Sequence, residues 1–89
     1  MFDTVPLVHY RVEVTIAKPL DDQSCRFLDA VQRSANRLVG FSGDTCSTTL
    51  MVEVSVMCRE DAVGAAAGEV ARIFPNSNDE KYGEPREIR

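Results

Sequence analysis

The sequence has no tryptophan, one histidine and only three cysteines among its 89 residues. Cys25, Cys46 and Cys58 stand at wide spacings without a Cys-x-x-Cys pair, and their number is odd. Neither a zinc site nor a disulfide framework fits this pattern, and a single histidine excludes a multi-histidine metal site. We therefore expect no metal ion or other cofactor, and three reduced thiols packed as small apolar side chains in the core.

The sequence also lacks long apolar runs and clusters of basic residues. No run approaches the roughly 18 apolar residues that cross a bilayer, and Asp3 places an acid where a signal peptide carries lysines. The 10 basic and 14 acidic residues are interleaved, and the net charge of −4 repels phosphate backbones. We expect a cytoplasmic protein that binds neither membranes nor nucleic acid.

Two segments, 8–17 and 49–59, alternate between apolar and polar residues. Successive side chains of a strand point to opposite faces, so the alternation predicts two strands with one core side and one open side. Their β-branched residues pack well in a sheet. The predicted core side carries Val8, Tyr10, Val12, Val14 and Ile16, then Leu50, Val52, Val54, Val56 and Cys58. The predicted open side carries His9, Arg11, Glu13 and Thr15, then Met51, Glu53, Ser55, Met57 and Arg59.

Apolar residues at helical spacing predict two helices, from Asp22 to Val39 and from Ala62 to Phe74. Asp21 is placed to cap the first helix, and Gly40 to end it in the left-handed conformation. Glu60 and Asp61 are placed to cap the second helix. The predicted core stripe of the second helix is Val63, Ala66, Ala67, Val70 and Phe74, with Ile73 beside it.

Two weaker strands are predicted over 41–46 and 81–89. Gly43 lowers the strand stability of the first, and Pro85 restricts the second to an edge strand or, from residue 85 onward, a loose tail. The order β-α-β-β-α-β, in a single domain over residues 1–89, is that of the ferredoxin-like fold. We therefore expect an α+β sandwich in which a four-stranded antiparallel sheet has two helices on one face and an open second face.

Functional families that share this fold depend on features that the sequence lacks. An RNA-recognition motif presents aromatic rings on its central strands, where this sequence has an arginine, two glutamates and a methionine. After the first strand, a heavy-metal carrier holds paired cysteines, an acylphosphatase holds an arginine and a glycine-rich cradle, and an ACT domain often uses a glycine. The loop 18–22 has none of these, and its two aspartates repel phosphate.

Three further features each have two interpretations. Cys25 lies in the first helical turns, where it is either a packing residue or a nucleophilic thiol activated by the helix dipole. Gly64 and Gly68 form a strip of small residues that packs either against the first helix or against a second subunit. Glu13 and Glu53 are either a carboxylate pair for acid–base or metal chemistry, or ion-pair partners of nearby arginines.

The predicted open side carries the candidate functional residues. The leading hypothesis is a non-catalytic module that forms a symmetric dimer through this side and acts as an interaction or small-ligand-binding unit, because adaptable methionines among charges are typical of binding surfaces. The alternative is a small dimeric enzyme with a polar cleft there, although no nucleophile–base pair supports catalysis. The cleft would use His9, Arg11, Glu13 and Glu53. The candidate interface or ligand-binding residues are His9, Arg11, Glu13, Met51, Glu53 and Met57.

Overall fold

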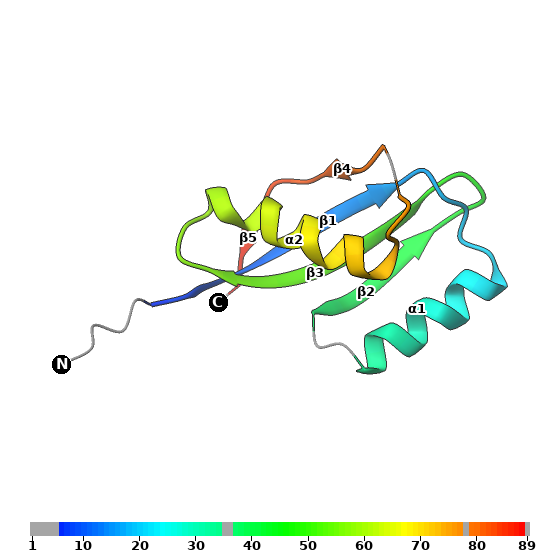
Figure 1. The fold of residues 1–89 in the computed structure, drawn as a ribbon, viewed down its shortest axis with the longest axis horizontal. Helices are drawn as coiled ribbons and strands as arrows, with labels where there is room; N and C mark the ends of the chain where they lie inside the picture. Colours follow the sequence, from blue (N-terminus) through cyan, green and yellow to red (C-terminus); the bar gives the residue numbers. More distant parts are fainter. Residues whose placement is uncertain (1–5, 35–36, 78, 89) are drawn as a thin grey trace.

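The computed structural model describes residues 6–34, 37–77 and 79–88. Two helices and an antiparallel sheet form an α+β fold, as the sequence predicts (Figure 1). In chain order the elements are β1 (Val8–Ile16), α1 (Asp22–Ser34), β2 (Leu38–Gly43), β3 (Thr48–Val56), α2 (Glu60–Ile73), β4 (Lys81–Tyr82) and β5 (Arg86–Glu87).

The two strictly alternating segments, β1 and β3, form the centre of the sheet. They pair antiparallel along their whole length, from Val8 opposite Val56 to Ile16 opposite Thr48. β2 pairs with the other side of β3, while β4 and β5 pair with the other side of β1. The strand order is therefore β2-β3-β1-β4, with β5 further along the same edge of β1. The predicted antiparallel pairing of the two segments is confirmed.

The sheet edge along β1 is a strand interrupted by a bulge. β4 and β5 pair with two separate parts of β1, and between them the three residues 83–85 stand opposite only residues 12–13. The N–H of Gly83 donates to the carbonyl of Glu13 at 2.8 Å, which holds the bulge against β1. Pro85 has no N–H to give, and a bulge at a sheet edge tolerates it. Of the two alternatives that the sequence left open, an edge strand or a loose tail, the structure has the edge strand.

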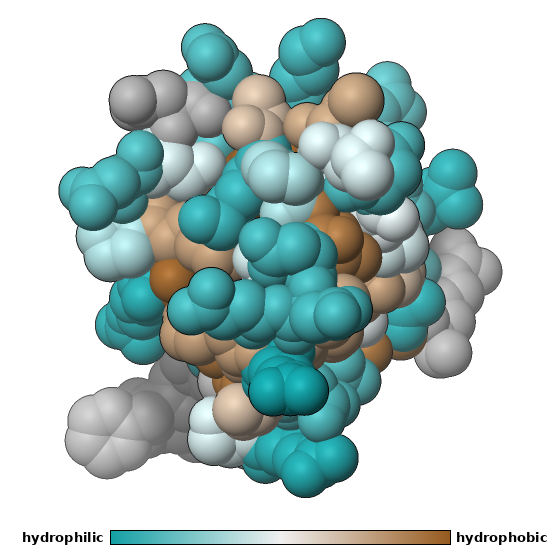
Figure 2. Space-filling model, turned by 90° about the vertical axis from the view of Figure 1, so that its right-hand side faces the viewer, coloured by the Kyte–Doolittle hydropathy of each residue, from teal (hydrophilic) through white to brown (hydrophobic). Residues whose placement is uncertain are grey.

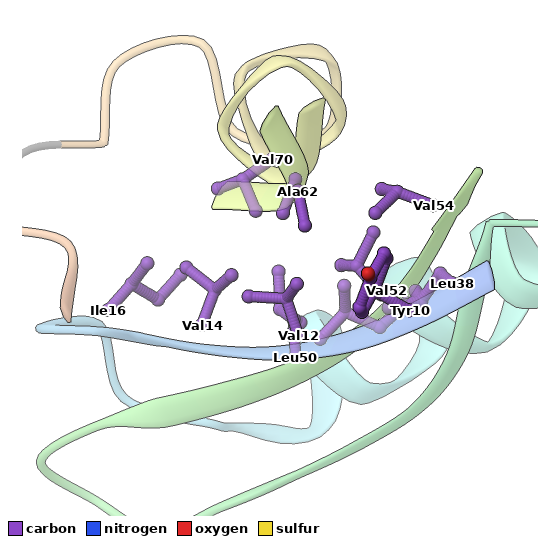
Figure 3. Packing of buried hydrophobic residues seen from close by; sticks show 12 residues of the cluster. Tyr10, Val12, Val14, Ile16, Leu38, Leu50, Val52, Val54, Ala62 and Val70 are labelled. Carbon is purple, nitrogen blue, oxygen red and sulfur yellow. The ribbon is translucent and has the colours of Figure 1, made fainter. Parts of the chain in front are cut away.

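The core lies on the predicted core side of both central strands. Figure 3 shows Val12 and Val14 of β1 pointing toward α2, from which Ala62 and Val70 point back. Leu28 of α1 belongs to the same buried cluster, so both helices pack against one face of the sheet. Each fully buried aliphatic side chain contributes about 1.5–3 kcal/mol to stability. The buried apolar residues are Tyr10, Val12, Val14, Ile16, Leu28, Leu38, Leu50, Val52, Val54, Ala62, Ala66 and Val70.

α1 is shorter than the sequence predicts, because its predicted end, Val39, lies in β2. The second strand occupies Leu38–Gly43 rather than 41–46. Leu38 follows the apolar residues of α1 at helical spacing, so the sequence pattern did not separate it from the helix. In the structure Leu38 pairs with Val52 of β3 and keeps only 2% of its surface exposed. Burial and strand pairing of Leu38 outweigh its local helical pattern.

The two helices begin differently. The backbone N–H of Ser24 donates to Asp21 Oδ1 at 2.7 Å, so the predicted cap of α1 is confirmed. Hydrogen bonds from Ser24 also lower the pKa of Asp21. At α2 the predicted caps are wrong, because Arg59 occupies the cap position without a side-chain hydrogen bond. Glu60 and Asp61 lie in the first turn, where acids still interact favourably with the helix dipole.

The face of α2 that packs on the sheet is rotated from the predicted stripe. Its buried residues are Ala62, Ala66 and Val70, whereas the predicted Val63 and Ala67 are only half-buried. Alanines and valines occupy half of the helix and stand on several sides of it, so its composition does not specify one apolar face. The fit of small alanine side chains against the valine-rich sheet decides which row is buried.

All three cysteines are free thiols, and none of them is fully buried. Cys46 and Cys58 are exposed and only Cys25 is half-buried, so the prediction of three core thiols is wrong for the first two. β3 ends at Val56, and Cys58 therefore falls outside the alternation that placed it inside. Its thiol donates to Asp61 Oδ2 at 3.1 Å. This hydrogen bond raises the pKa of Cys58, which makes the thiol a weaker nucleophile.

Candidate functional site

The sheet face opposite the helices carries five of the six predicted site residues, and we call it the open face. Its side chains project from β1 and β3 between the core-facing ones. Met57, the sixth predicted residue, lies beyond β3 in a bend and has 61% of its surface exposed. Directly opposite one another across the two strands are His9 and Ser55, Arg11 and Glu53, Glu13 and Met51, and Thr15 and Thr49.

One ion pair crosses the centre of the open face. Arg11 Nη2 lies 2.9 Å from Glu53 Oε2, with 46% and 34% of the two side chains exposed. At this exposure such a pair contributes about 0.2–1 kcal/mol. Of the two interpretations of Glu53, the structure has the ion pair with an arginine. Among the described residues the Glu13 side chain makes no ion pair, and Arg59 reaches Glu84 at 3.6 Å instead.

His9 contacts a hydroxyl that the sequence interpretation did not pair with it. Ser55 Oγ lies 2.7 Å from His9 Nδ1. This is within the hydrogen-bond range found between a catalytic nucleophile and its general base. Within the described part of the chain no acid contacts the second ring nitrogen of His9. The two residues also do not line the hollow of this face. The contact is a cross-strand hydrogen bond on an exposed sheet, and only the register of β1 against β3 reveals it.

Met51 lies flat across the neighbouring strand instead of standing away from the sheet. Gly40 of β2 is its cross-strand partner, and a Cβ at position 40 would lie 2.6 Å from the terminal methyl carbon of Met51. No described glycine has a positive φ, so the predicted left-handed helix stop at Gly40 is wrong. Glycine at this position instead provides room for the methionine side chain.

A hollow of about 590 Å³ lies between the open face and the bulged edge. Arg11, Glu13 and Met51 line it, whereas His9, Glu53 and Met57 do not, so the predicted set divides into two halves. Arg86 of β5 lies directly opposite Arg11 and also lines the hollow. Two like charges in opposite positions repel each other. The other residues around the hollow are Arg59, Gly83, Glu84, Pro85, Glu87 and Ile88.

The remaining candidates from the sequence stay apart from the open face. The space beside Gly64 and Gly68 is empty, because a Cβ at either position would have no neighbour within 4 Å. The predicted packing of this strip against α1 is therefore wrong. Cys25 lies on α1, on the other side of the sheet from His9. Across residues 6–34, 37–77 and 79–88, no group of three or more His, Cys, Asp or Glu residues is arranged to hold a metal ion.

The end of the molecule at the loop after β1 is mostly polar (Figure 2). Seen end-on from the side of the loop after β1, polar side chains cover most of the surface, and apolar ones show between them (Figure 2). No helix in the described part of the chain has the length and apolar character needed to traverse a bilayer. Comparisons with protein-family models, curated proteins and solved structures give no match.

Proposed function

We propose that the chain is a non-catalytic interaction module that associates with a second copy through the open face. The observation that carries this proposal is the one-sided covering of the sheet: both helices pack on one face, and the other presents Met51 among charged residues. A monomer tolerates an uncovered sheet face when that face is polar throughout. A mixed face suits a partner, and a symmetric dimer is the commonest closed assembly.

The charges of the open face are compatible with a second copy of the same face. Arg11 and Glu53 neutralise each other within one chain. Glu13 and Arg86 face the same hollow, and neither side chain makes an ion pair within the described residues. A two-fold axis that lies in the contact plane between Glu13 and Arg86 brings Glu13 of one copy toward Arg86 of the other, and the reverse. Opposite charges therefore meet on both sides of this axis.

We also propose the ferredoxin-like fold for this sheet and its helices. The strand order β2-β3-β1-β4, with two central strands from the first and third positions of the chain, supports it. Two exposed free thiols, Cys46 and Cys58, suit a reducing compartment such as the cytoplasm.

A small ligand is the second candidate occupant of the open face, and the hollow favours it. Arg86 and Glu13 offer one charge of each sign without an ion-pair partner among the described residues, beside apolar atoms of Met51 and Ile88. A small zwitterion such as a free amino acid matches this chemistry. Backbone NMR shifts at Glu13 and Arg86 on addition of millimolar amino acids support this candidate, and unchanged shifts reject it.

The enzyme alternative has less support. Of its four residues, only Arg11 and Glu13 line the hollow. His9 is hydrogen-bonded to Ser55, and Glu53 is held by Arg11. A cleft that gathers a base, a nucleophile and a charge-stabilising group is the minimum for such chemistry. The four side chains instead lie along the exposed face of the β1–β3 pair.

The test of the association uses lysine substitutions in the middle of the open face. Met51→Lys with Glu53→Lys places like charges across the axis and leaves the core unchanged, so we expect the molar mass by light scattering at micromolar concentration to halve. The matched control is Ala71→Lys with Glu60→Lys, which makes the same charge change on exposed positions of α2. Circular dichroism checks the fold of both variants. An unchanged mass in the open-face variant rejects the proposal.

A further inference from the structure

A row of four charged residues runs along one flank of α1. Asp22, Arg26, Asp29 and Arg33 follow one another at helical spacing, alternate in sign and are all exposed. We call this row the α1 stripe. Arg33 Nη2 contacts Asp29 Oδ2 at 2.8 Å, whereas Asp22 and Arg26 make no ion pair with any described residue. The intrahelical pair of Asp29 and Arg33 stabilises α1 itself, whereas Asp22 and Arg26 remain available to charges of another chain.

The contacts of α1 fix the direction in which the stripe points. Leu28 faces the sheet and is fully buried. On one flank, the Phe27 ring lies 5.7 Å from the ring of Phe74, at the end of α2. On the other flank, Gln32 Nε2 donates to the carbonyl of Val39 in β2 at 3.2 Å. At about 100° per residue, the stripe lies beyond Gln32 on this second flank, away from α2.

The stripe therefore borders the outer edge of β2, and α1 lies on the β2 side of the sheet in Figure 1. β2 pairs with β3 alone, so its other edge has no neighbouring strand within the described sheet. Its sequence, Leu-Val-Gly-Phe-Ser-Gly, holds neither a charge nor a proline. Natural edge strands usually carry such residues because they prevent pairing with another chain.

We propose that a second copy of the chain docks at this edge, with α1 antiparallel to α1 and β2 antiparallel to β2 about a two-fold axis. An axis through the middle of α1 places Asp22 opposite Arg33 of the second copy, and Arg26 opposite Asp29. All four charges of each stripe then face an opposite charge. The uncharged β2 edges meet below the helices, where backbone groups of both strands can pair. The alternating order of the stripe is what makes the surface complementary to itself.

This edge contact and the open face use different parts of the sheet. One chain can therefore make both contacts, and the assembly closes at four chains where the two two-fold axes cross at a right angle. Variants of the stripe remove only the edge contact, and the Met51→Lys/Glu53→Lys variant removes only the open-face contact. The two proposals accordingly stand or fall separately.

The test is a pair of complementary charge reversals. Arg26→Glu with Arg33→Glu makes the stripe wholly acidic, and Asp22→Lys with Asp29→Lys makes it wholly basic. We expect each variant alone to have half the wild-type molar mass by light scattering, because identical stripes repel each other. An equimolar mixture of the two variants restores the wild-type mass, because an acidic stripe then meets a basic one.

The mixture separates docking from misfolding, since an unfolded variant does not recover by mixing with another. The matched control, Arg72→Glu with Ala71→Glu and Asn76→Asp, makes the same charge change as the acidic variant at exposed positions on and just after α2, and its mass stays at the wild-type value. The proposal is overturned by stripe variants that keep the wild-type mass, or by a mixture that stays at half of it. A wild-type chain that is monomeric at micromolar concentration overturns it as well.

Discussion

The two edges of the sheet are built in opposite ways. The edge along β1 consists of two-residue strands, β4 and β5, separated by a bulge that contains Pro85. The edge along β2 is one uncharged strand of six residues, with a register shift only between Leu38 and Gly40. Short strands, bulges, proline and charge all prevent a further strand from pairing. The chain therefore protects one edge and leaves the other able to pair.

The two edges also differ in how completely the rest of the chain covers them. At the β1 edge, backbone hydrogen bonds from Gly83 and Ile88 hold the bulged segment against β1. At the β2 edge, α1 has only one fully buried residue, Leu28, and the aromatic ring of Phe27 remains 45% exposed. A second copy can cover the β2 edge, where the hydrogen bond printed between α1 and the β2 backbone uses a single carbonyl, that of Val39.

The largest expected effect is on the free energy of unfolding, and it comes from the side chain that packs each edge against the core. Leu38→Ala at the β2 edge removes a buried side chain, so the free energy of unfolding falls by about 2–5 kcal/mol in urea titrations. Tyr82→Ala at the β1 edge costs less than half as much, because Tyr82 is only half-buried. An equal loss of unfolding free energy in the two variants would show that Leu38 and Tyr82 contribute equally to stability.

A lysine on the unprotected edge tests whether that edge pairs. Ser42→Lys places a charge on an exposed position of β2, and we expect it to weaken the edge contact about tenfold, which is about 1.4 kcal/mol. Sedimentation equilibrium in the Met51→Lys/Glu53→Lys background measures this contact alone. Asn76→Lys, with the same charge change in an exposed turn, serves as the control and leaves the dissociation constant unchanged.

A smaller effect concerns the register between β2 and β3. Because a Cβ at position 40 would meet the end of the Met51 side chain, the effects of Gly40→Ala and Met51→Ala on unfolding free energy should not add. We expect a coupling of about 0.5–1 kcal/mol in a double-mutant cycle, with Gly40→Ala better tolerated when Met51 is alanine. Additive effects would show that Met51 does not require a glycine at position 40.

The smallest expected effects are on local stability, which the β2 edge should lose in acid and the β1 edge in alkali. Asp44, in the turn after β2, accepts backbone hydrogen bonds from Cys46 and Ser47, which lower its pKa below the usual 3.8. A lowered folded-state pKa means that Asp44 stabilises the fold above pH 3.8, and this stability is lost as the pH falls through the lower value. The amide protection of the β2–β3 turn, corrected for the intrinsic exchange rate at each pH, should therefore fall first in acid, and Asp44→Asn should remove that pH dependence.

The β1 edge should respond to alkali instead. Burial, together with a hydrogen bond from the Tyr82 hydroxyl to Glu80, raises the pKa of Tyr82 from 10.0 to about 12. A raised folded-state pKa means that the stability is fully present below pH 10.0 and is lost as the pH rises toward 12. Once the base-catalysed intrinsic exchange rate is divided out, the protection of the Lys81 and Tyr82 amides should fall over this range, and Tyr82→Phe should keep its protection. A larger loss of amide protection at β2 than at β4 in alkali would show that Tyr82 does not cause this pH dependence.

The central strands could be predicted because their local pattern and their final environment agree. Every alternate residue of β1 from Tyr10 to Ile16 is buried, and the side chains between them are exposed or half-buried. Strand pattern, β-branched residues and burial all favour one structure there. α2 was predicted as a helix for the same reason. The residues that α2 buries were not predicted correctly, because small apolar residues stand on more than one side of this helix and each of these sides can pack on a sheet.

The candidate site could be predicted only as a set of residues on one face. Alternation placed Arg11 and Glu53 on the same side, and the expected ion pair is present. The contact of His9 with Ser55, the position of Met51 over Gly40 and the hollow beside the bulge depend on register, which a one-residue shift would change completely. The α1 stripe is visible in the sequence as spacing, but its direction is not.

The sequence by itself determined the α+β class, the antiparallel pair of central strands and the side of each strand that is buried, because side-chain periodicity acts through neighbours in the chain. Only the tertiary structure decided that Leu38 leaves the helix for β2, that the last segment forms a bulged edge and that the α1 stripe borders an open edge. Each of these depends on contacts between residues far apart in the chain, whose free energy outweighs the local preference.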